Sequence, residues 1–246
     1  FGLVGAAVTM PHKDTAATLV DSLQGDGAKL QSINTLVCDR AAQRWEGFST
    51  DGFGVVAALG AHLKELGRRA DKGRPITALV LGAGGAAWAA AFALDQAGVA
   101  VSFSARSPEK LRAKGRSIGF LPQKVHPWER RHEVAWDVLI HATPVGSRAR
   151  GGDLTEVPLD LNRSHRGHLV LDMITSPAET TLLKEARRLG LIGVSGVEMW
   201  THQGLPQLQR WTGRVFTEDD LRPLIQREME HRSSGRWSTE TKRERS

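Results

Sequence analysis

A short apolar run that ends in a glycine-rich turn constrains the fold of this chain more than any other feature. Residues 75–82 (PITALVLG) have the composition of a buried strand. Glycines follow at once in 81–87 (LGAGGAA), and 85–97 consists of good helix formers that end before Gly98, a typical residue beyond a helix C-terminus. A strand, a tight turn of glycines and a helix, in this order, let backbone N–H groups approach a phosphate closely.

Alternation between apolar runs and helical segments continues from residue 74 to residue 194. The runs that predict further strands are 99–105, 137–143 and 168–173. Helix starts are expected at Ser107, as the N-cap before Pro108, and at Ser176-Pro177. Parallel strands that are joined by right-handed helical crossovers form a Rossmann-type, doubly wound α/β sheet, which is the fold we expect.

Two helical segments lie outside this alternation. Apolar residues recur at helical spacing over 50–66, and we expect this helix to bridge the first 60 residues and the sheet. Residues 196–211 also have helical character, although Gly204 and Pro206 interrupt them. Because proline costs about 3 kcal/mol in a helix interior, we expect a kink that turns the side chain of Gln203 elsewhere.

Charge and cysteine content exclude several classes of protein. The formal net charge is +6, but much of the basic charge lies among acids in 227–246, which is typical of a solvated tail rather than of a nucleic-acid arm. Cys38 is the single cysteine, so we expect neither disulfides nor a metal site. No apolar run approaches the ~20 residues that span a bilayer. We therefore expect a cytoplasmic protein with no nucleic-acid or membrane partner.

The glycine turn is the predicted cofactor site. Gly82, Ala83 and Gly84 form the turn, while Gly85 and Ala86 open a helix whose free N–H groups and dipole favour a phosphate. The alternative is a tight strand–helix turn that binds no ligand. The strand before and the helix and second strand after the turn favour a dinucleotide site.

The end of the second predicted strand selects between the two nicotinamide cofactors. A site for NAD expects Asp or Glu there to bind the ribose 2′-hydroxyl, whereas this chain has Arg106 and Ser107. A guanidinium pairs well with a 2′-phosphate, so the predicted cofactor is NADP. An ordinary surface arginine is the alternative interpretation of Arg106.

Polar residues elsewhere fall in four further strings: VTMPHK (8–13), SINTLV (32–37), GFSTDGFG (47–54) and GVEMWTHQ (196–203). Individually they are unremarkable, because a lone Lys13 is normally solvated, Asn34 can be a turn residue and Asp51 can cap the helix that follows it. Together, in order with the glycine turn, the Arg106 stretch and ATPVG (142–146), they resemble the motifs of the shikimate dehydrogenase family. The resemblance covers residues 1–213.

This resemblance implies an NADP-dependent oxidoreductase, shikimate dehydrogenase (NADP+), that interconverts 3-dehydroshikimate and shikimate in aromatic amino acid (chorismate) biosynthesis. It makes Lys13 and Asp51 the catalytic pair. The further residues that it implies are Thr9, Asn34, Asp51 and Gln203 for the substrate, and Thr143 and Gly196 in addition to the predicted NADP residues for the cofactor.

The chemistry of carbonyl reduction agrees with this pair. Negative charge develops on the carbonyl oxygen, and a lysine held close to that oxygen can stabilise the charge and supply the proton. A carboxylate beside the lysine orients it and can accept a hydrogen bond from a substrate hydroxyl. The expected site lies between two domains, at the carboxyl ends of the parallel strands.

The chain also departs from the family's pattern. It begins at Phe1, after the place of the Ser-x-Ser that binds the substrate carboxylate; Thr175 stands where the family expects Tyr, and Ala7 where many members have Asn or Ser. We expect an N-terminally truncated chain, compatible with the dehydrogenase part of a bifunctional 3-dehydroquinate dehydratase/shikimate dehydrogenase. A quinate/shikimate-type dehydrogenase of altered specificity and a catalytically impaired NADP-binding homologue stay open as alternatives.

The expected division of the chain follows from these assignments. Residues 1–60 are the remainder of a truncated α/β substrate-binding domain, 61–195 the NADP-binding domain, 196–226 helices that return to the substrate domain, and 227–246 a disordered tail. The expected partner is the small-molecule substrate, and the chain is expected to be a monomer or a homodimer, compatible with fusion to an upstream domain.

Overall fold

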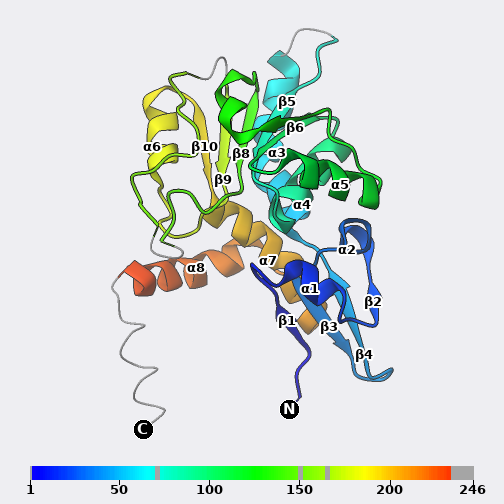
Figure 1. Cartoon of the computed structure of the whole chain (residues 1–246). Helices are drawn as coiled ribbons and strands as arrows, with labels where there is room; N and C mark the ends of the chain where they lie inside the picture. Colours follow the sequence, from blue (N-terminus) through cyan, green and yellow to red (C-terminus); the bar gives the residue numbers. More distant parts are fainter. Residues whose placement is uncertain (1, 70–72, 149–151, 164–166, 234–246) are drawn as a thin grey trace.

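Two separate β-sheets organise the protein. The computed structural model describes residues 2–69, 73–148, 152–163 and 167–233 (Figure 1). The smaller sheet has the strand order β1-β3-β4-β2, and the larger sheet has the order β10-β9-β8-β5-β6-β7. Helix α7 (Gly196–Thr212) contacts β10 of the larger sheet and β3 of the smaller one, so it links the two.

The smaller sheet contains the N-terminal residues. Its elements are β1 (Gly5–Ala7), α1 (Lys13–Ala17), β2 (Ser22–Leu23), α2 (Gly25–Leu30), β3 (Thr35–Asp39) and β4 (Arg44–Phe48). Strand β3 pairs antiparallel with both β1 and β4, whereas β2 pairs parallel with β4. The backbone N–H of Val8 donates to the carbonyl of Asn34, which places the start of α1 beside the segment that leads into β3.

The larger sheet is entirely parallel, which confirms the predicted Rossmann-type, doubly wound fold. Its strands are β5 (Thr77–Leu81), β6 (Ala100–Ala105), β7 (Lys124–Pro127), β8 (Val138–His141), β9 (Leu169–Asp172) and β10 (Ile192–Ser195). The chain moves outward from β5 to β6 and β7, and then returns to place β8 on the other side of β5. The carboxyl ends of β5 and β8 therefore form the topological switch point, where such sheets bind ligands.

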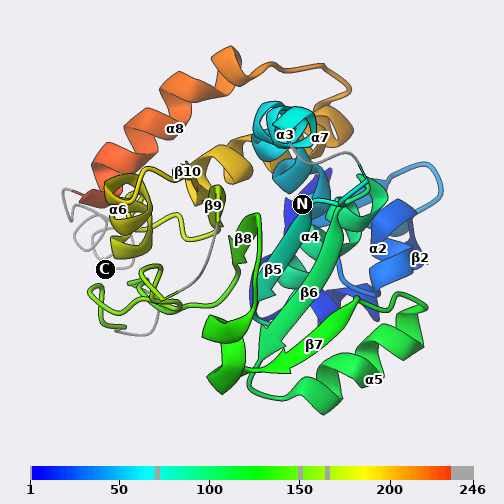
Figure 2. The same ribbon diagram turned by 90° about the horizontal axis from the view of Figure 1, so that it is seen from above.

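Helices bury both faces of this sheet. Alternate residues of β5 separate into two cores: Val80 packs in one core with Trp88 of α4 (Gly85–Gln96), and Leu79 packs in the other with Leu183 of α6 (Thr181–Arg188). Figure 2 shows α5 (Pro108–Ile118) beside β7 at one end of the sheet and α6 near β10 at the other. Burial of both faces explains why the strands are apolar runs rather than alternating ones.

Of the two expected helix starts, one is confirmed and the other is misplaced. Ser107 is the residue before α5, as predicted, but its side chain makes no capping hydrogen bond. The helix predicted to open at Ser176-Pro177 begins instead at Thr181, because the hydroxyl of Thr180 accepts the N–H of Leu183 and caps the helix there. The 3₁₀ turn η1 (Trp128–Glu133) follows β7.

The C-terminal expectation was wrong in part. Helix α8 (Glu218–Ser233) includes residues 227–233, which we expected to be disordered, whereas 234–246 lie outside the described residues. Three acidic residues open α8 and interact favourably with the positive end of the helix dipole: Glu218, Asp219 and Asp220. Leu221 of the same helix is buried. Within the described part of the chain, no helix is both long and apolar enough to cross a membrane.

Candidate active site

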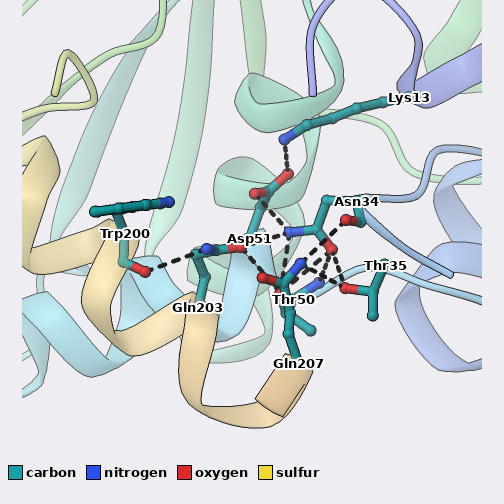
Figure 3. A network of polar contacts seen from close by, with 8 residues as sticks. All are labelled: Lys13, Asn34, Thr35, Thr50, Asp51, Trp200, Gln203 and Gln207. Carbon is teal, nitrogen blue, oxygen red and sulfur yellow. Dashed lines mark hydrogen bonds and ion pairs between the residues drawn. The ribbon is translucent and has the colours of Figure 1, made fainter. Parts of the chain in front are cut away.

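The structure brings the side chains of Lys13 and Asp51 together. Lys13 opens α1, and Asp51 opens α3 (Asp51–Arg69), the helix that leads from the smaller sheet to the larger one. The Nζ atom of Lys13 donates to Oδ2 of Asp51 at 2.5 Å, with the two side chains 16% and 7% exposed (Figure 3). An ammonium has three donors, so this ion pair leaves donors on Lys13 for a ligand.

Asn34 holds the second oxygen of that carboxylate. Its Nδ2 donates to Oδ1 of Asp51 at 2.9 Å and is also within hydrogen-bond distance of Thr50 Oγ1 (2.9 Å). Its Oδ1 accepts from the backbone N–H of Thr50 at 3.0 Å and from the hydroxyl of Thr35 at 2.8 Å. Asn34 is buried, so these contacts fix the orientation of its amide and, through it, that of Asp51.

Gln203 belongs to the same network, and this corrects the expectation that Pro206 would turn it away. Its Oε1 lies 2.8 Å from Nδ2 of Asn34, and its Nε2 donates to the carbonyl of Trp200 at 3.2 Å. Helix α7 continues through Pro206 to Thr212. A proline removes only its own N–H and disturbs the carbonyl four residues earlier, so the partners of the Gln203 side chain decide where it points.

Sequence reasoning missed three buried members of the network, Thr35, Thr50 and Gln207. The hydroxyl of Thr50 donates to Oε1 of Gln203 at 3.2 Å. Gln207, one turn beyond Gln203 on α7, donates from Nε2 to the hydroxyl of Thr35 at 2.8 Å and to the carbonyl of Asn34 at 3.0 Å. The four-residue spacing, which puts Gln207 on the same helix face as Gln203, is the sequence signal that could have identified Gln207.

Two glycines of the DGFG string (51–54) explain how Asp51 reaches this position. A Cβ at Gly54 would lie 2.7 Å from the carbonyl oxygen of Met199 and 2.8 Å from Cβ of Gln203, both on α7. A Cβ at Gly52 would lie 2.9 Å from the carbonyl oxygen of Ala89 on α4. The first turn of α3 thus packs against two helices at distances that only glycine permits.

The glycine turn fits a phosphate-containing cofactor. Gly82 has φ +115°, and a Cβ there would lie 2.8 Å from the carbonyl oxygen of Ala142, so the β5–β8 switch point requires glycine. Gly84 is the N-cap of α4 and makes no side-chain cap, and no described atom lies within 4 Å of where its Cβ would be. The N-terminus of α4, where free N–H groups favour an anion, is thus open on the Gly84 side.

The glycine turn and the Lys13–Asp51 pair are neighbours. A Cβ at Gly85 would lie 2.5 Å from Oγ of Ser32 and 3.6 Å from Cβ of Lys13. A second contact joins α1 to another helix of the larger sheet: Nζ of Lys114 on α5 donates to Oδ2 of Asp14 on α1 at 3.0 Å. The N-terminus of α4 thus faces the start of α1.

The other predicted site residues lie at the ends of strands, at the start of a helix and in turns. Arg106 is exposed and Ser107 half-buried at the carboxyl end of β6, and Thr143 is half-buried beyond the end of β8. Gly196 opens α7, and a Cβ there would lie 2.4 Å from the carbonyl oxygen of Ile174. Thr9 is exposed in the turn before α1. The remaining predicted residues, Ala83 and Ala86, are exposed and half-buried in the glycine turn.

Comparison with known proteins identifies the family. No protein-family model matches the chain. The shikimate dehydrogenase (NADP+) of Acidiphilium cryptum is 39% identical over 221 residues, which are 89% of this chain and 74% of that protein. The chain belongs to the shikimate dehydrogenase family.

Solved structures of shikimate dehydrogenases and related enzymes have the same fold. The shikimate 5-dehydrogenase of Thermus thermophilus, in complex with NADP(H) and shikimate, is similar with a TM-score of 0.73 and 30% identity, over 92% of this chain and 79% of that one. The quinate dehydrogenase of Corynebacterium glutamicum, in complex with NAD, is similar with a TM-score of 0.74 and 26% identity, over 90% and 77% of the two chains. Among the described residues, no three His, Cys, Asp or Glu side chains are grouped so that they could hold a metal ion.

Proposed function

We infer that this chain is an NADP-dependent oxidoreductase that interconverts 3-dehydroshikimate and shikimate. One observation supports this most strongly: a largely buried Lys13–Asp51 pair, 2.5 Å apart, lies beside the glycine turn of a parallel sheet in a member of the shikimate dehydrogenase family. The family explains the reaction, and the pair supplies the acid–base chemistry that the reaction needs.

Lys13 acts at the oxygen of the substrate carbonyl. NADPH, when bound, supplies the reducing equivalent. The Lys13 ammonium stabilises the negative charge that develops on the carbonyl oxygen and donates the proton that converts this oxygen to a hydroxyl. Asp51 orients the ammonium, and Asn34 orients Asp51. Thr9, Asn34, Asp51 and Gln203 are the proposed substrate-binding residues.

The cofactor residues divide according to the strands that they follow. The N–H groups of Ala83, Gly84, Gly85 and Ala86 bind the pyrophosphate at the N-terminus of α4. Gly82, whose own N–H donates to the carbonyl of Ser104, contributes the turn that brings this backbone close to the cofactor. Arg106 and Ser107, after β6, bind the 2′-phosphate that distinguishes NADP from NAD. Thr143, after β8, and Gly196, at the start of α7, line the nicotinamide side.

Membership of the family does not determine several other predictions from the sequence. The division at residues 60/61, 195/196 and 226/227 stays a proposal; its first boundary falls inside α3 and its last inside α8. The monomeric or homodimeric state, an upstream fused domain and a cytoplasmic location also stay predictions. Light scattering after size-exclusion chromatography measures the oligomeric state.

Shikimate-dependent reduction of NADP+ by the purified chain tests the proposed function. Lys13→Met removes the proposed general acid, and we expect it to lower kcat about 10²- to 10⁴-fold, the range for general acid–base catalysis. Lys29→Met, which removes an exposed lysine of α2, is the matched control and is expected to leave kcat unchanged. Turnover by the unaltered chain no higher than that of Lys13→Met contradicts the proposal.

Quinate and NAD+ in the same assay test the alternative that Thr175 suggests. Thr175 stands half-buried in the segment after β9, where the family expects a tyrosine that helps to hold the substrate. A higher kcat/KM for quinate than for shikimate would identify quinate as the preferred substrate. NADPH binding in calorimetry without turnover of either compound would identify a catalytically impaired homologue.

A further inference from the structure

A fully buried histidine and a fully buried aspartate face each other beneath the proposed nicotinamide side of the site. His141 ends β8 and Asp172 ends β9, and the two residues are register partners across these strands. Both are 0% exposed, and Nδ1 of His141 lies 3.0 Å from Oδ1 of Asp172. The function proposed above uses neither side chain.

The other partners of Asp172 are hydrogen-bond donors. Its Oδ1 accepts the backbone N–H of Ile174 at 3.0 Å, and its Oδ2 accepts the hydroxyl of Thr180 at 2.6 Å. A carboxylate with two such donors is an acceptor toward its third partner as well. We therefore assign the ring proton of His141 to Nδ1, where it is donated to Asp172.

That assignment determines the direction of the next hydrogen bond. Nε2 of His141 lies 2.7 Å from Oγ1 of Thr143. In the neutral ring with a proton on Nδ1, Nε2 can only accept, so the hydroxyl of Thr143 donates to it. The Thr143 oxygen then offers lone pairs only, one of which is near the backbone N–H of Val145 at a long 3.4 Å.

Thr143 lies at the switch point, next to the first glycine of the glycine turn. It is half-buried beyond the carboxyl end of β8, and its Cγ2 is 3.2 Å from where a Cβ of Gly82 would be. The segment that Asp172 holds through the N–H of Ile174 also lies against Gly196, whose Cβ would be 2.4 Å from the Ile174 carbonyl oxygen. One buried carboxylate thus orders both Thr143 and the backbone beside Gly196.

We propose that His141 and Asp172 are positioning residues that hold the Thr143 hydroxyl as a fixed hydrogen-bond acceptor for a donor on the nicotinamide-riboside half of NADPH. The donor is either the carboxamide N–H or a ribose O–H, which present the same chemistry to the Thr143 oxygen. The inference rests on the proposed function, since it requires that NADPH binds at the glycine turn.

A double-mutant cycle with NADPH binding as the readout tests this arrangement. Thr143→Val removes the hydroxyl, and Thr143→Ser keeps it. His141→Asn keeps an amide N–H near the place of Nδ1 for Asp172 but removes Nε2. Calorimetry is expected to show about 3- to 10-fold weaker NADPH binding for Thr143→Val and for His141→Asn, the size of one neutral hydrogen bond. The double variant is expected to bind no more weakly than either single variant, and Thr143→Ser to bind as the unaltered chain.

Two further measurements complete the test. Nitrogen-15 NMR of the unaltered chain is expected to show His141 as the neutral ring protonated at Nδ1. The 3-acetylpyridine analogue of NADPH, which lacks the carboxamide N–H, identifies the donor. If the donor is the carboxamide, Thr143→Val binds this analogue as tightly as the unaltered chain does; if it is a ribose hydroxyl, the substitution weakens binding of both compounds equally.

Several outcomes overturn the inference and leave the proposed function standing. These are shikimate turnover with unchanged NADPH affinity in Thr143→Val or His141→Asn, additive losses in the double variant, or a His141 ring protonated at Nε2. A chain that neither turns over shikimate nor binds NADPH would instead refute the proposed function. If His141→Asn does not fold, the two Thr143 variants and the NMR spectrum of the unaltered chain still decide.

Discussion

The Nζ atom of Lys13 and Oδ2 of Asp51 are 2.5 Å apart although 38 positions separate the two residues in the chain. The other oxygen of Asp51 accepts from Nδ2 of Asn34 at 2.9 Å, so both oxygens of the carboxylate have a partner. Asn34 in turn contacts Gln203, which connects the pair to α7. The ammonium is thereby held in one orientation before any substrate binds.

Replacement of Asp51 by its isosteric amide tests this orientation. Asp51→Asn removes the charge that aligns Lys13 while it preserves the shape of the side chain, and we expect kcat for shikimate oxidation to fall about 10²-fold. The affinity for NADPH is expected to be unchanged, because Asp51 is not among the proposed cofactor residues. Asp95→Asn, at an exposed position near the end of α4, is the matched control. Equal kcat values for the two variants would contradict the role of Asp51.

Alanine substitutions at two glycines of α3 distinguish the effect of close packing on stability from the effect of helix propensity. Gly54→Ala would place a Cβ 2.7 Å from the Met199 carbonyl oxygen, and overpacking of this kind lowers the free energy of unfolding by about 1–3 kcal/mol. Gly60→Ala, on the same helix, meets no described atom within 4 Å and is expected to raise that free energy by up to about 1 kcal/mol. Urea denaturation measures both changes. Lower kcat is expected for Gly54→Ala alone, because the clash displaces α3 from Gln203.

Arg106 is the predicted determinant of NADP preference. Arg106→Gln removes a charged partner of the 2′-phosphate, worth about 1.5–3 kcal/mol, so KM for NADPH is expected to rise at least about 10-fold. KM for NADH, which lacks that phosphate, is expected to change little. Arg116→Gln, an exposed arginine in the last turn of α5, is the control. An equal rise in KM for NADPH and for NADH would show that Arg106 does not bind the 2′-phosphate.

Asp137, the residue before β8, is expected to make the free energy of unfolding depend on pH. Burial raises the pKa of the Asp137 carboxyl, but hydrogen bonds from Arg74 and Thr77 outweigh it and hold that pKa below its ordinary value. A depressed folded-state pKa stabilises the fold above the unfolded-state pKa of about 3.9, and this contribution is lost as pH falls through the folded-state value.

Asp137→Asn measures this contribution. At pH 7 we expect the free energy of unfolding to fall by about 1–3 kcal/mol, since the buried hydrogen bonds lose their charged acceptor. The difference between the unaltered chain and the variant is expected to shrink below about pH 4, where the Asp137 carboxyl of the unfolded chain becomes protonated, and to disappear as pH falls through the lower folded-state pKa. Urea denaturation at about pH 7, 5 and 3.5 provides the comparison. A difference that is constant over this range would contradict the assigned cause.

Local signals account for the parts of the fold that were predicted correctly. The strand at 75–82, the glycine turn and the helix after it appear within a few residues of their expected places. By contrast, the edge strands β7 (KVHP) and β10 (IGVS) were not predicted, because they lack the continuous apolar runs of the equally short but fully buried strands β8 and β9. The start of α6 was misplaced because Ser-Pro and Thr180 are both plausible helix starts, and only the tertiary contacts of Thr180 with Asp172 distinguish them.

The amino-acid sequence by itself determined the class of sheet, the glycine turn and the residue types available for catalysis, because these depend on periodicity and on backbone freedom over a few neighbouring residues. The family resemblance paired Lys13 with Asp51, but tertiary structure alone decided how these residues meet and which others join them. Lys13 reaches Asp51 because α1, the Asn34 segment and the first turn of α3 pack together. Gln203 joins them despite Pro206 because its side chain meets Asn34, a residue 169 positions away in the chain. Such contacts arise from long-range packing, which no local pattern of residues specifies.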